Sequence, residues 1–228
     1  MTDDHDELSN PDWPKPDDSL ASVLRVPGTR GRDVSRCVAC LDWMWSGREH
    51  VYIQGYAEAA EVVLRHAVRS RHDQDTLVYP ILFLFRHHVE LSLKRIVWLA
   101  RDLYECDVPL RQVHSLQTLW QDASKCMRAG GKLRKGSRDE WQAVGRCVRQ
   151  LNDMDRESEA VRYPVDKHGE EHVLMSPLGR KVDPVTHVDL VALGELISKI
   201  VNFLQGVTDM LEAELEARAE MTAYFACE

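Results

Sequence analysis

The sequence has little glycine or proline and no long uninterrupted hydrophobic stretch. Its 228 residues include 12 Gly and 9 Pro, which excludes collagen-like and low-complexity chains. No run approaches the ~18 consecutive apolar residues of a membrane-spanning helix, so we expect no membrane partner. Hydrophobic residues make up 44% and charged residues 29%, a balance typical of a helix-rich globular protein. At this length we expect a single core.

Several motifs of common enzyme classes are also missing. The chain contains no GxxxxGK[ST], GxGxxG, HExxH or GxSxG pattern, which argues against common nucleotide hydrolases, dinucleotide enzymes, zinc proteases and serine hydrolases. Cys37 and Cys40 have the spacing of a zinc-binding pair, but no second pair or Cys/His set follows at a typical distance. We therefore expect no metal and no cofactor.

The first residues and the cysteines indicate a cytoplasmic location. Asp3, Asp4, Asp6 and Glu7 stand where a secretory signal would have a basic region followed by an apolar one. The six cysteines are scattered, and three of them fall in segments with a helical pattern. This arrangement is typical of reduced thiols and not of a disulfide framework.

The acidic excess is concentrated in the first twenty residues. They hold seven acids, one lysine and three prolines, whereas the rest of the chain carries 28 basic and 30 acidic residues. We expect residues 1–20 to be a disordered acidic tail, because they cannot bury enough apolar surface to offset their ordering entropy. Residues 21–48 should form an irregular segment with a short helix near 33–46. Residues 49–222 should form the helical body. The chain after residue 20 is nearly neutral overall, which is compatible with nucleic-acid binding.

Apolar residues recur every three or four positions in the body, which predicts five helices. We place them at about 50–70, 77–105, 116–129, 137–157 and 186–222. The second helix has two apolar rows and should be the centre of the bundle. In the last helix, apolar residues from Leu190 to Leu211 form a seam for a partner helix, and its excess length is a candidate oligomer contact. The predicted class is an all-α, up-and-down bundle.

A charged stripe interrupts the apolar pattern of the second predicted helix. Arg86, Glu90 and Lys94 are spaced four apart and share one face, beside His87 and His88. One interpretation is a structural ion-pair ladder, because an unpaired buried charge is costly. The other is a cleft in which Arg86 or His87 binds a phosphate.

A second group of candidates lies in a basic stretch between residues 128 and 149, which has seven basic and two acidic residues. Lys132, Arg134, Lys135 and Arg138 are candidates to bind an RNA backbone through its phosphates. The alternative is an ordinary solvated loop and helix face. His114, just before the third predicted helix, should help to cap that helix.

Arg162 and His168 stand in the irregular segment 158–184, where Pro164 and Gly169 indicate a loop. A guanidinium suits a phosphate or a phosphorane, and histidine moves protons near neutral pH. Together they could cleave RNA without a metal, through attack of the 2′-hydroxyl on phosphorus. The alternative is a chance pairing of two common residues in a surface loop.

Three motifs resemble those of a known family. The stretch Tyr79–Lys94, which ends in ELSLK, resembles the E-L-x-L-K helix of HEPN domains, and HSLQTL from His114 is similar to their H-x-L-x-x-L element. Arg162-Tyr163-Pro164 resembles the R-Y-P element that precedes their last long helix. HEPN domains are small helical bundles of bacterial toxins, phage-defence proteins and nucleotidyltransferase partners. The resemblance covers about residues 50–215.

For catalytic members, this resemblance implies a metal-independent endoribonuclease whose active site forms across a homodimer. Arg162 and His168 would then be the catalytic R-x4-6-H pair, although Tyr163 stands where the family usually has Asn, Asp or His. The implied partners are a second copy of the chain, RNA or a nucleotide, and a cognate antitoxin or defence protein. The alternative is a non-catalytic HEPN-like module that dimerises or holds a partner enzyme or nucleotide.

Overall fold

The computed structural model describes residues 48–134, 137–156, 158–175 and 184–226. This part of the chain forms five α-helices and no named strand, which confirms the all-α class. The helices are α2 (Arg48–Ser70), α3 (Gln74–Leu103), α4 (Leu116–Ala129), α5 (Ser137–Met154) and α6 (Leu190–Ala226). The predicted acidic tail 1–20 and the N-terminal segment up to residue 47, with its helix near 33–46, lie outside the described residues.

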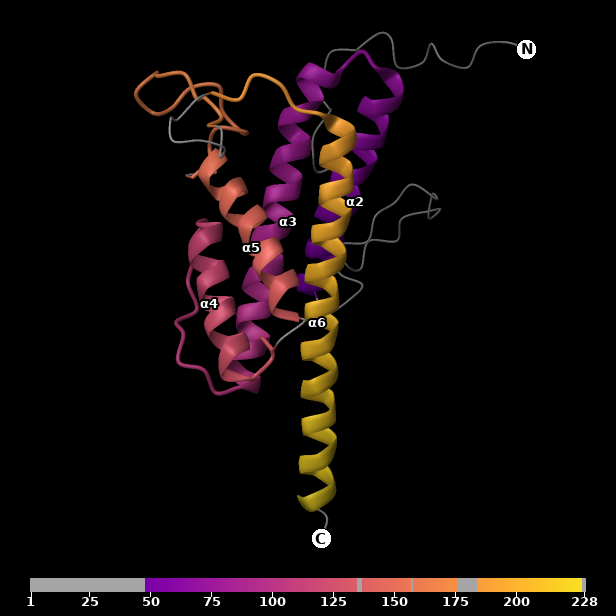
Figure 1. The fold of residues 1–228 in the computed structure, drawn as a ribbon, viewed down its shortest axis with the longest axis vertical. Coiled ribbons are helices and arrows are strands. Elements are labelled where there is room, and N and C mark those ends of the chain that lie inside the picture. Colours follow the sequence, from indigo (N-terminus) through magenta and orange to yellow (C-terminus); the bar gives the residue numbers. More distant parts are fainter. Residues whose placement is uncertain (1–47, 135–136, 157, 176–183, 227–228) are drawn as a thin grey trace, which may run out of the picture. The chain divides into compact units, whose positions relative to one another are not determined.

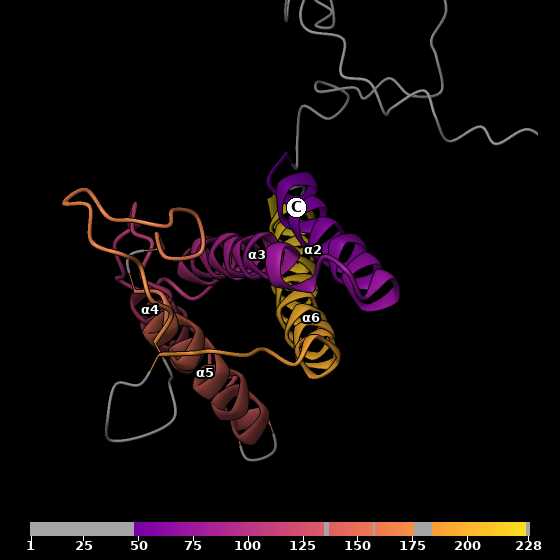
Figure 2. The same ribbon diagram turned by 90° about the horizontal axis from the view of Figure 1, so that it is seen from above.

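Helix α3 is the centre of the bundle. It packs against α2, α4 and α6, and Figure 2 shows it between the α2–α6 pair and the α4–α5 pair. Ile81, Val89, Leu93 and Ile96 are completely buried along it, which confirms the predicted central position. The second apolar row consists of Leu84, Leu91 and Trp98 and was expected to be buried as well. It is less buried than the first, because Leu84 and Leu91 are half-buried and Trp98 is 48% exposed.

Helix α4 begins with a side-chain cap. The Ser115 hydroxyl accepts a hydrogen bond from the Thr118 amide, which satisfies one of the free N–H groups of the first turn. The prediction that His114 would help to cap this helix is wrong, because its side chain turns to Glu90 on α3.

The starts of the last two helices lie close to their predicted positions. Helix α5 begins at Ser137, as predicted, and ends at Met154, three residues before the predicted end. The Asp189 carboxylate accepts hydrogen bonds from the amides of Val191 and Ala192. Asp189 therefore caps α6, which begins at Leu190, four residues after the predicted start.

The apolar seam of α6 finds its partners within the same chain. Ile197, Ile200, Leu204 and Leu211 are buried, and α6 packs against α3 and α2. Among the described helices, only α6 is long and apolar enough to cross a membrane, judged by length and composition alone. The buried seam accounts for part of this apolar character.

The C-terminal end of α6 extends beyond its neighbours (Figure 1). The Arg218 guanidinium still donates to the Leu103 carbonyl oxygen. Farther along, Met221, Tyr224 and Phe225 are 62%, 66% and 66% exposed. The described part of the chain thus leaves an apolar helix end uncovered.

Candidate functional site

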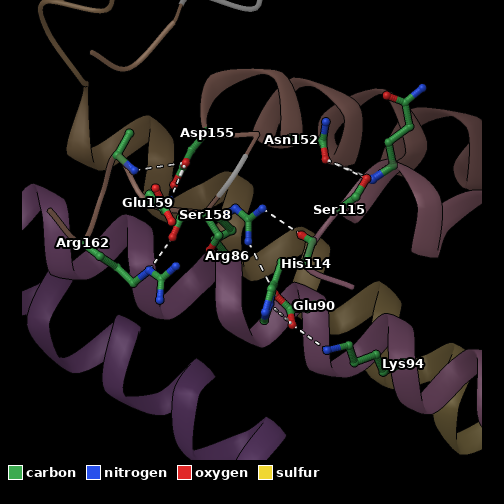
Figure 3. Close-up of polar contacts among 12 residues, drawn as sticks. Arg86, Glu90, Lys94, His114, Ser115, Asn152, Asp155, Ser158, Glu159 and Arg162 are labelled. Carbon is green, nitrogen blue, oxygen red and sulfur yellow. Dashed lines mark hydrogen bonds and ion pairs between the residues drawn. The ribbon is translucent and has the colours of Figure 1, made fainter. Parts of the chain in front are cut away.

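Glu90 on α3 is the centre of a polar cluster (Figure 3). Its side chain is 2% exposed, and its carboxylate lies 2.7 Å from Lys94 Nζ, 3.0 Å from His114 Nδ1 and 3.5 Å from Arg86 Nη1. Burial alone would raise the pKa of Glu90, but the hydrogen bond and charge of Lys94, together with His114, hold it below its ordinary value. Glu90 is therefore an ionised carboxylate at neutral pH.

Arg86 joins α3 to the connection before α4. Its side chain is 1% exposed, and Nη2 donates to the His114 carbonyl oxygen at 2.9 Å. Burial lowers the pKa of Arg86, while the carboxylates of Asp155 and Glu90 oppose that shift. This depth favours the structural ion-pair interpretation of Arg86 over direct phosphate binding.

His114 is held from two sides by these α3 residues. Arg86 binds its backbone carbonyl and Glu90 binds its Nδ1 atom, although the side chain is 66% exposed. An ionised carboxylate only accepts hydrogen bonds, so Nδ1 carries the proton in this pair. The ring is thus fixed by a buried carboxylate while its edge faces solvent, an arrangement that suits proton transfer.

His87 lies one residue along α3 from Arg86 and is half-buried. Its ring contacts Tyr56 edge-on at 4.4 Å and is stacked with Phe83 at 5.8 Å, measured between ring centroids. Burial lowers the pKa of His87; Glu90 opposes this, and the nearby charges of Lys94, His114 and Arg162 lower it further. Burial thus favours the neutral form of His87.

Arg162 reaches the same region from the segment between α5 and α6. Its guanidinium lies 5.4 Å from the Tyr163 ring centroid and 6.0 Å from that of Phe83, and Nε donates to the Ser158 carbonyl oxygen. Phe83 is also the ring that stacks with His87. We call Arg86, His87, Glu90, Lys94, His114 and Arg162 the α3 polar site.

The turn that carries Arg162 is fixed by Asp155. This buried carboxylate accepts hydrogen bonds from the amides of Glu159 and Ala160, at 2.9 and 3.2 Å. Its charge also acts on Arg86. Asp155 therefore positions the Arg162 turn and faces the buried end of the site.

His168 is not joined to Arg162. It is exposed, and its backbone amide donates to the Asp166 carboxylate at 2.7 Å in a turn where Gly169 has φ +83°. Within the described segments, no hydrogen bond, ion pair or ring contact links the Arg162 and His168 side chains. The loop interpretation of this segment is confirmed, while the catalytic pairing stays a prediction.

The candidates of the basic stretch have other contacts. Lys132 binds Glu214 and lies 5.9 Å from the centroid of the Tyr104 ring, and Arg134 donates to the Gly131 carbonyl oxygen. Arg138 is exposed, and Lys135 lies outside the described residues. Lys132 thus holds α6 in this structure, and RNA binding by the stretch stays a prediction.

The sequence contained only weak indications of the contacts that His114 and His87 make in the site. His114 lies 24 residues from Glu90, a separation that no helical spacing rule connects, although the H-x-L resemblance marked it. Tyr56 and Phe83, the ring partners of His87, were not predicted. The Tyr56 contact depends on how α2 crosses α3, whereas Phe83 lies four residues before His87 on α3, a spacing that could have indicated it.

No metal site is present in the part of the chain that the structure describes: no three His, Cys, Asp or Glu side chains are grouped to hold an ion. Cys37 and Cys40 lie outside that part. Comparison of the chain with protein-family models, curated proteins and solved structures found no match.

Proposed function

We propose that this protein is a HEPN-like, metal-independent endoribonuclease that acts in toxin or phage-defence biology in the cytoplasm. The observation that carries the proposal is that two histidines lie near Glu90 in different environments. His87 is half-buried with a lowered pKa, whereas His114 is exposed and bound by an ionised carboxylate. RNA cleavage through the 2′-hydroxyl needs one proton acceptor and one proton donor.

In the proposed reaction, neutral His87 accepts the proton of a ribose 2′-hydroxyl. The 2′-oxygen attacks the adjacent phosphorus, and the bond from phosphorus to the 5′-oxygen breaks. The imidazolium form of His114 donates a proton to that leaving oxygen. The products are a 2′,3′-cyclic phosphate and a 5′-hydroxyl, and both histidines return to their starting forms by proton exchange with water.

Two cations of the site would stabilise the charge that develops on the phosphoryl oxygens. Lys94 is 28% exposed and bound on one side by Glu90, and Arg162 is exposed above two aromatic rings. Fixed cations next to a developing oxyanion stabilise the transition state more than the ground state. The family motif would assign proton transfer to His168 instead of His114, and the experiment below separates the two.

The test is cleavage of end-labelled single-stranded RNA by the purified protein in EDTA. We expect His87→Ala, His114→Ala and Arg162→Ala each to reduce the rate by about 10²- to 10⁴-fold, with 2′,3′-cyclic phosphate ends in the wild-type products. His66→Ala, at an exposed histidine of α2, is the matched control and should cleave normally.

The same assay includes His168→Ala. Full activity of this variant, with loss in His114→Ala, would support the α3 polar site. Loss in His168→Ala with normal cleavage by His114→Ala would return the catalytic role to the family motif. Equal residual cleavage in all variants would identify a contaminating nuclease and contradict the proposal.

A second candidate function, a non-catalytic dimerisation module, is favoured by the uncovered end of α6. Met221, Tyr224 and Phe225 present apolar surface beyond the hydrogen bond from Arg218 to Leu103, and a second copy or a cognate antitoxin would cover it. Light scattering should then show a homodimer in the wild type and a monomer in Met221→Ser/Phe225→Ser. A wild-type monomer would rule out self-association.

A further inference from the structure

A hollow of about 370 Å³ lies along α3 next to the α3 polar site. It is formed by the start of α2, the second half of α3 and the connection to α4. Lys94 lines this hollow and also binds Glu90. The α3–α4 connection contributes His114 to the polar site and residues 109–112 to the hollow. The two features are therefore contiguous.

The lining of the hollow combines buried apolar residues with exposed aromatic and charged ones. Ile53, Val97 and Leu119 are buried, whereas Tyr52 and Trp98 are 59% and 48% exposed. The charged lining residues are four cations and two anions: Arg48, Lys94, Arg95 and Arg111, and Glu49 and Asp122. A volume of about 300–1,000 Å³ with an apolar lining and few polar groups is typical of small-ligand sites.

Trp98 is exposed and yet held in place. The Arg95 guanidinium lies 4.8 Å from the centroid of its ring, and Arg95 is itself bound by Glu212 at 2.8 Å and Glu49 at 3.1 Å. An aromatic side chain that is positioned before binding loses little entropy when a second ring stacks on it. Such platforms bind nucleobases, because every base has a flat π face.

Groups suited to the other parts of a nucleotide lie in the same lining. Arg111 is 44% exposed and lies 3.0 Å from Asp122, and its guanidinium fork suits a phosphate. Lys94 supplies a second cation. The Gln112 amide can donate to and accept from the edge of a base.

We propose that this hollow binds one nucleotide unit, with the base stacked on Trp98 and the phosphate between Lys94 and Arg111. The inference deepens the proposed function, on which it rests for its biological meaning, since it adds a base-binding position that shares Lys94 with the α3 polar site. A free nucleotide and a nucleotide within an RNA strand share this chemistry.

Calorimetric titration of the full-length protein tests the inference. The probes are UMP, AMP, uridine, ribose 5-phosphate and a 2′-O-methyl RNA hexamer, which cannot be cleaved because its 2′-hydroxyls are blocked. Both mononucleotides should bind at least about tenfold more tightly than uridine, which lacks the phosphate, or ribose 5-phosphate, which lacks the base. Trp98→Ala should weaken binding of mononucleotide and hexamer by about 5- to 100-fold.

Three further variants complete the design. Arg111→Gln should weaken the binding of both mononucleotides but leave the binding of uridine unchanged, since the substitution removes a contact to the phosphate. Tyr224→Ala, an exposed aromatic on α6 outside the hollow, is the control and should bind normally. His114→Ala should abolish cleavage and retain nucleotide binding, so that failure of the catalytic proposal and failure of this one are distinguishable.

A hexamer that binds more tightly than UMP and AMP identifies an RNA strand as the natural occupant, and equal affinities identify a free nucleotide. Failure of the mononucleotides and the hexamer to bind would overturn the inference. So would affinities that Trp98→Ala leaves unchanged.

Discussion

Two ionic clusters, one centred on α3 and one that joins α6 to its neighbours, differ chiefly in burial. The α3 polar site is built on Glu90, whose side chain is 2% exposed. The second cluster, which we call the α6 clamp, consists of Glu212, Glu214 and Arg218 on α6 with their partners Arg95, Tyr104, Lys132 and Glu105. Its α6 carboxylates Glu212 and Glu214 are 36% and 32% exposed.

This difference in burial changes what each cluster can do. A buried charge must be paired and hydrogen-bonded, because its desolvation costs several kcal/mol. A half-exposed pair is screened by water and contributes about 0–1 kcal/mol. The α3 polar site therefore needs all of its partners to keep its buried charges paired, and it positions His114. The contacts of the α6 clamp hold α6, and each of them can be lost at little cost in stability.

The largest expected difference follows from removing the central carboxylate of each cluster. Glu90→Gln leaves the buried Arg86 guanidinium without its nearest counter-charge and should lower the free energy of unfolding by about 3–5 kcal/mol. Glu214→Gln should cost about 1 kcal/mol or less. Urea unfolding at pH 7 measures both.

A double variant sharpens this result. Arg86→Met/Glu90→Leu removes both buried charges and should recover most of the lost stability, because apolar replacement of a buried ion pair is often neutral. Equal losses in Glu90→Gln and Glu214→Gln would show that burial does not separate the two clusters.

A smaller effect is expected from crowding the clamp. A Cβ atom on Gly130 would lie 2.5 Å from carbon atoms of the Tyr104 ring, so Gly130→Ala should displace that ring and cost about 1–3 kcal/mol. Gly55→Ala is the matched control, since no atom lies within 4 Å of its added Cβ, and it should stabilise α2 by about 0.5–1 kcal/mol. The midpoint temperature of thermal unfolding should fall in Gly130→Ala and rise in Gly55→Ala.

As the pH is lowered, the histidines of α3 should reduce the stability of the protein before the carboxylates of the two clusters do. Burial lowers the pKa of His88, against the opposing hydrogen bond of the Ile53 carbonyl, and burial also lowers that of His87. The ordinary pKa of a histidine is 6.5, so below pH 6.5 these two histidines bind more protons in the unfolded state than in the folded state. The free energy of unfolding therefore decreases as the pH is lowered. Below about 4.5, Glu90 and Glu214, whose pKa values are also lowered, add a further loss. Urea unfolding between pH 8 and pH 4 should show both stages.

Alkali should act on the clamp. Burial and the hydrogen bond to Glu214 raise the pKa of Tyr104, so the unfolded state loses its phenolic proton first and stability falls above pH 10. The buried Cys126 thiol, whose pKa burial and Cys106 raise to about 12, contributes in the same direction. Tyr104→Phe should remove only the tyrosine part of this loss, and an unchanged alkaline profile would contradict the assignment.

The smallest effect is expected at the outer end of the clamp. Arg218 is 52% exposed and its ionic partner Glu105 is 82% exposed. Arg218→Ala should therefore change the free energy of unfolding by no more than about 1 kcal/mol. A loss comparable to that of Glu90→Gln would show that α6 depends on this contact far more than its exposure indicates.

Much of the helical framework was predictable because helix formation leaves a local signal. The periodicity of Ile81, Val89 and Leu93 predicted a central α3, and the predicted α5 start at Ser137 is confirmed. The start of α6 was predicted four residues too early, because Asp189 accepts the first amide hydrogen bonds and the helix begins after it, at Leu190. The exposure of Trp98 was missed because an apolar row shows which face it occupies and not whether another element covers it.

The sequence by itself determined that the chain forms long helices and that α3 carries Arg86, Glu90 and Lys94 on one stripe, because both follow from spacing along a single helix. Only the tertiary structure decided that Glu90 is buried, that His114 binds its carboxylate and that Arg162 lies over the Phe83 ring. These contacts join residues on different elements, so they depend on how the helices and their connections pack, which no local period encodes.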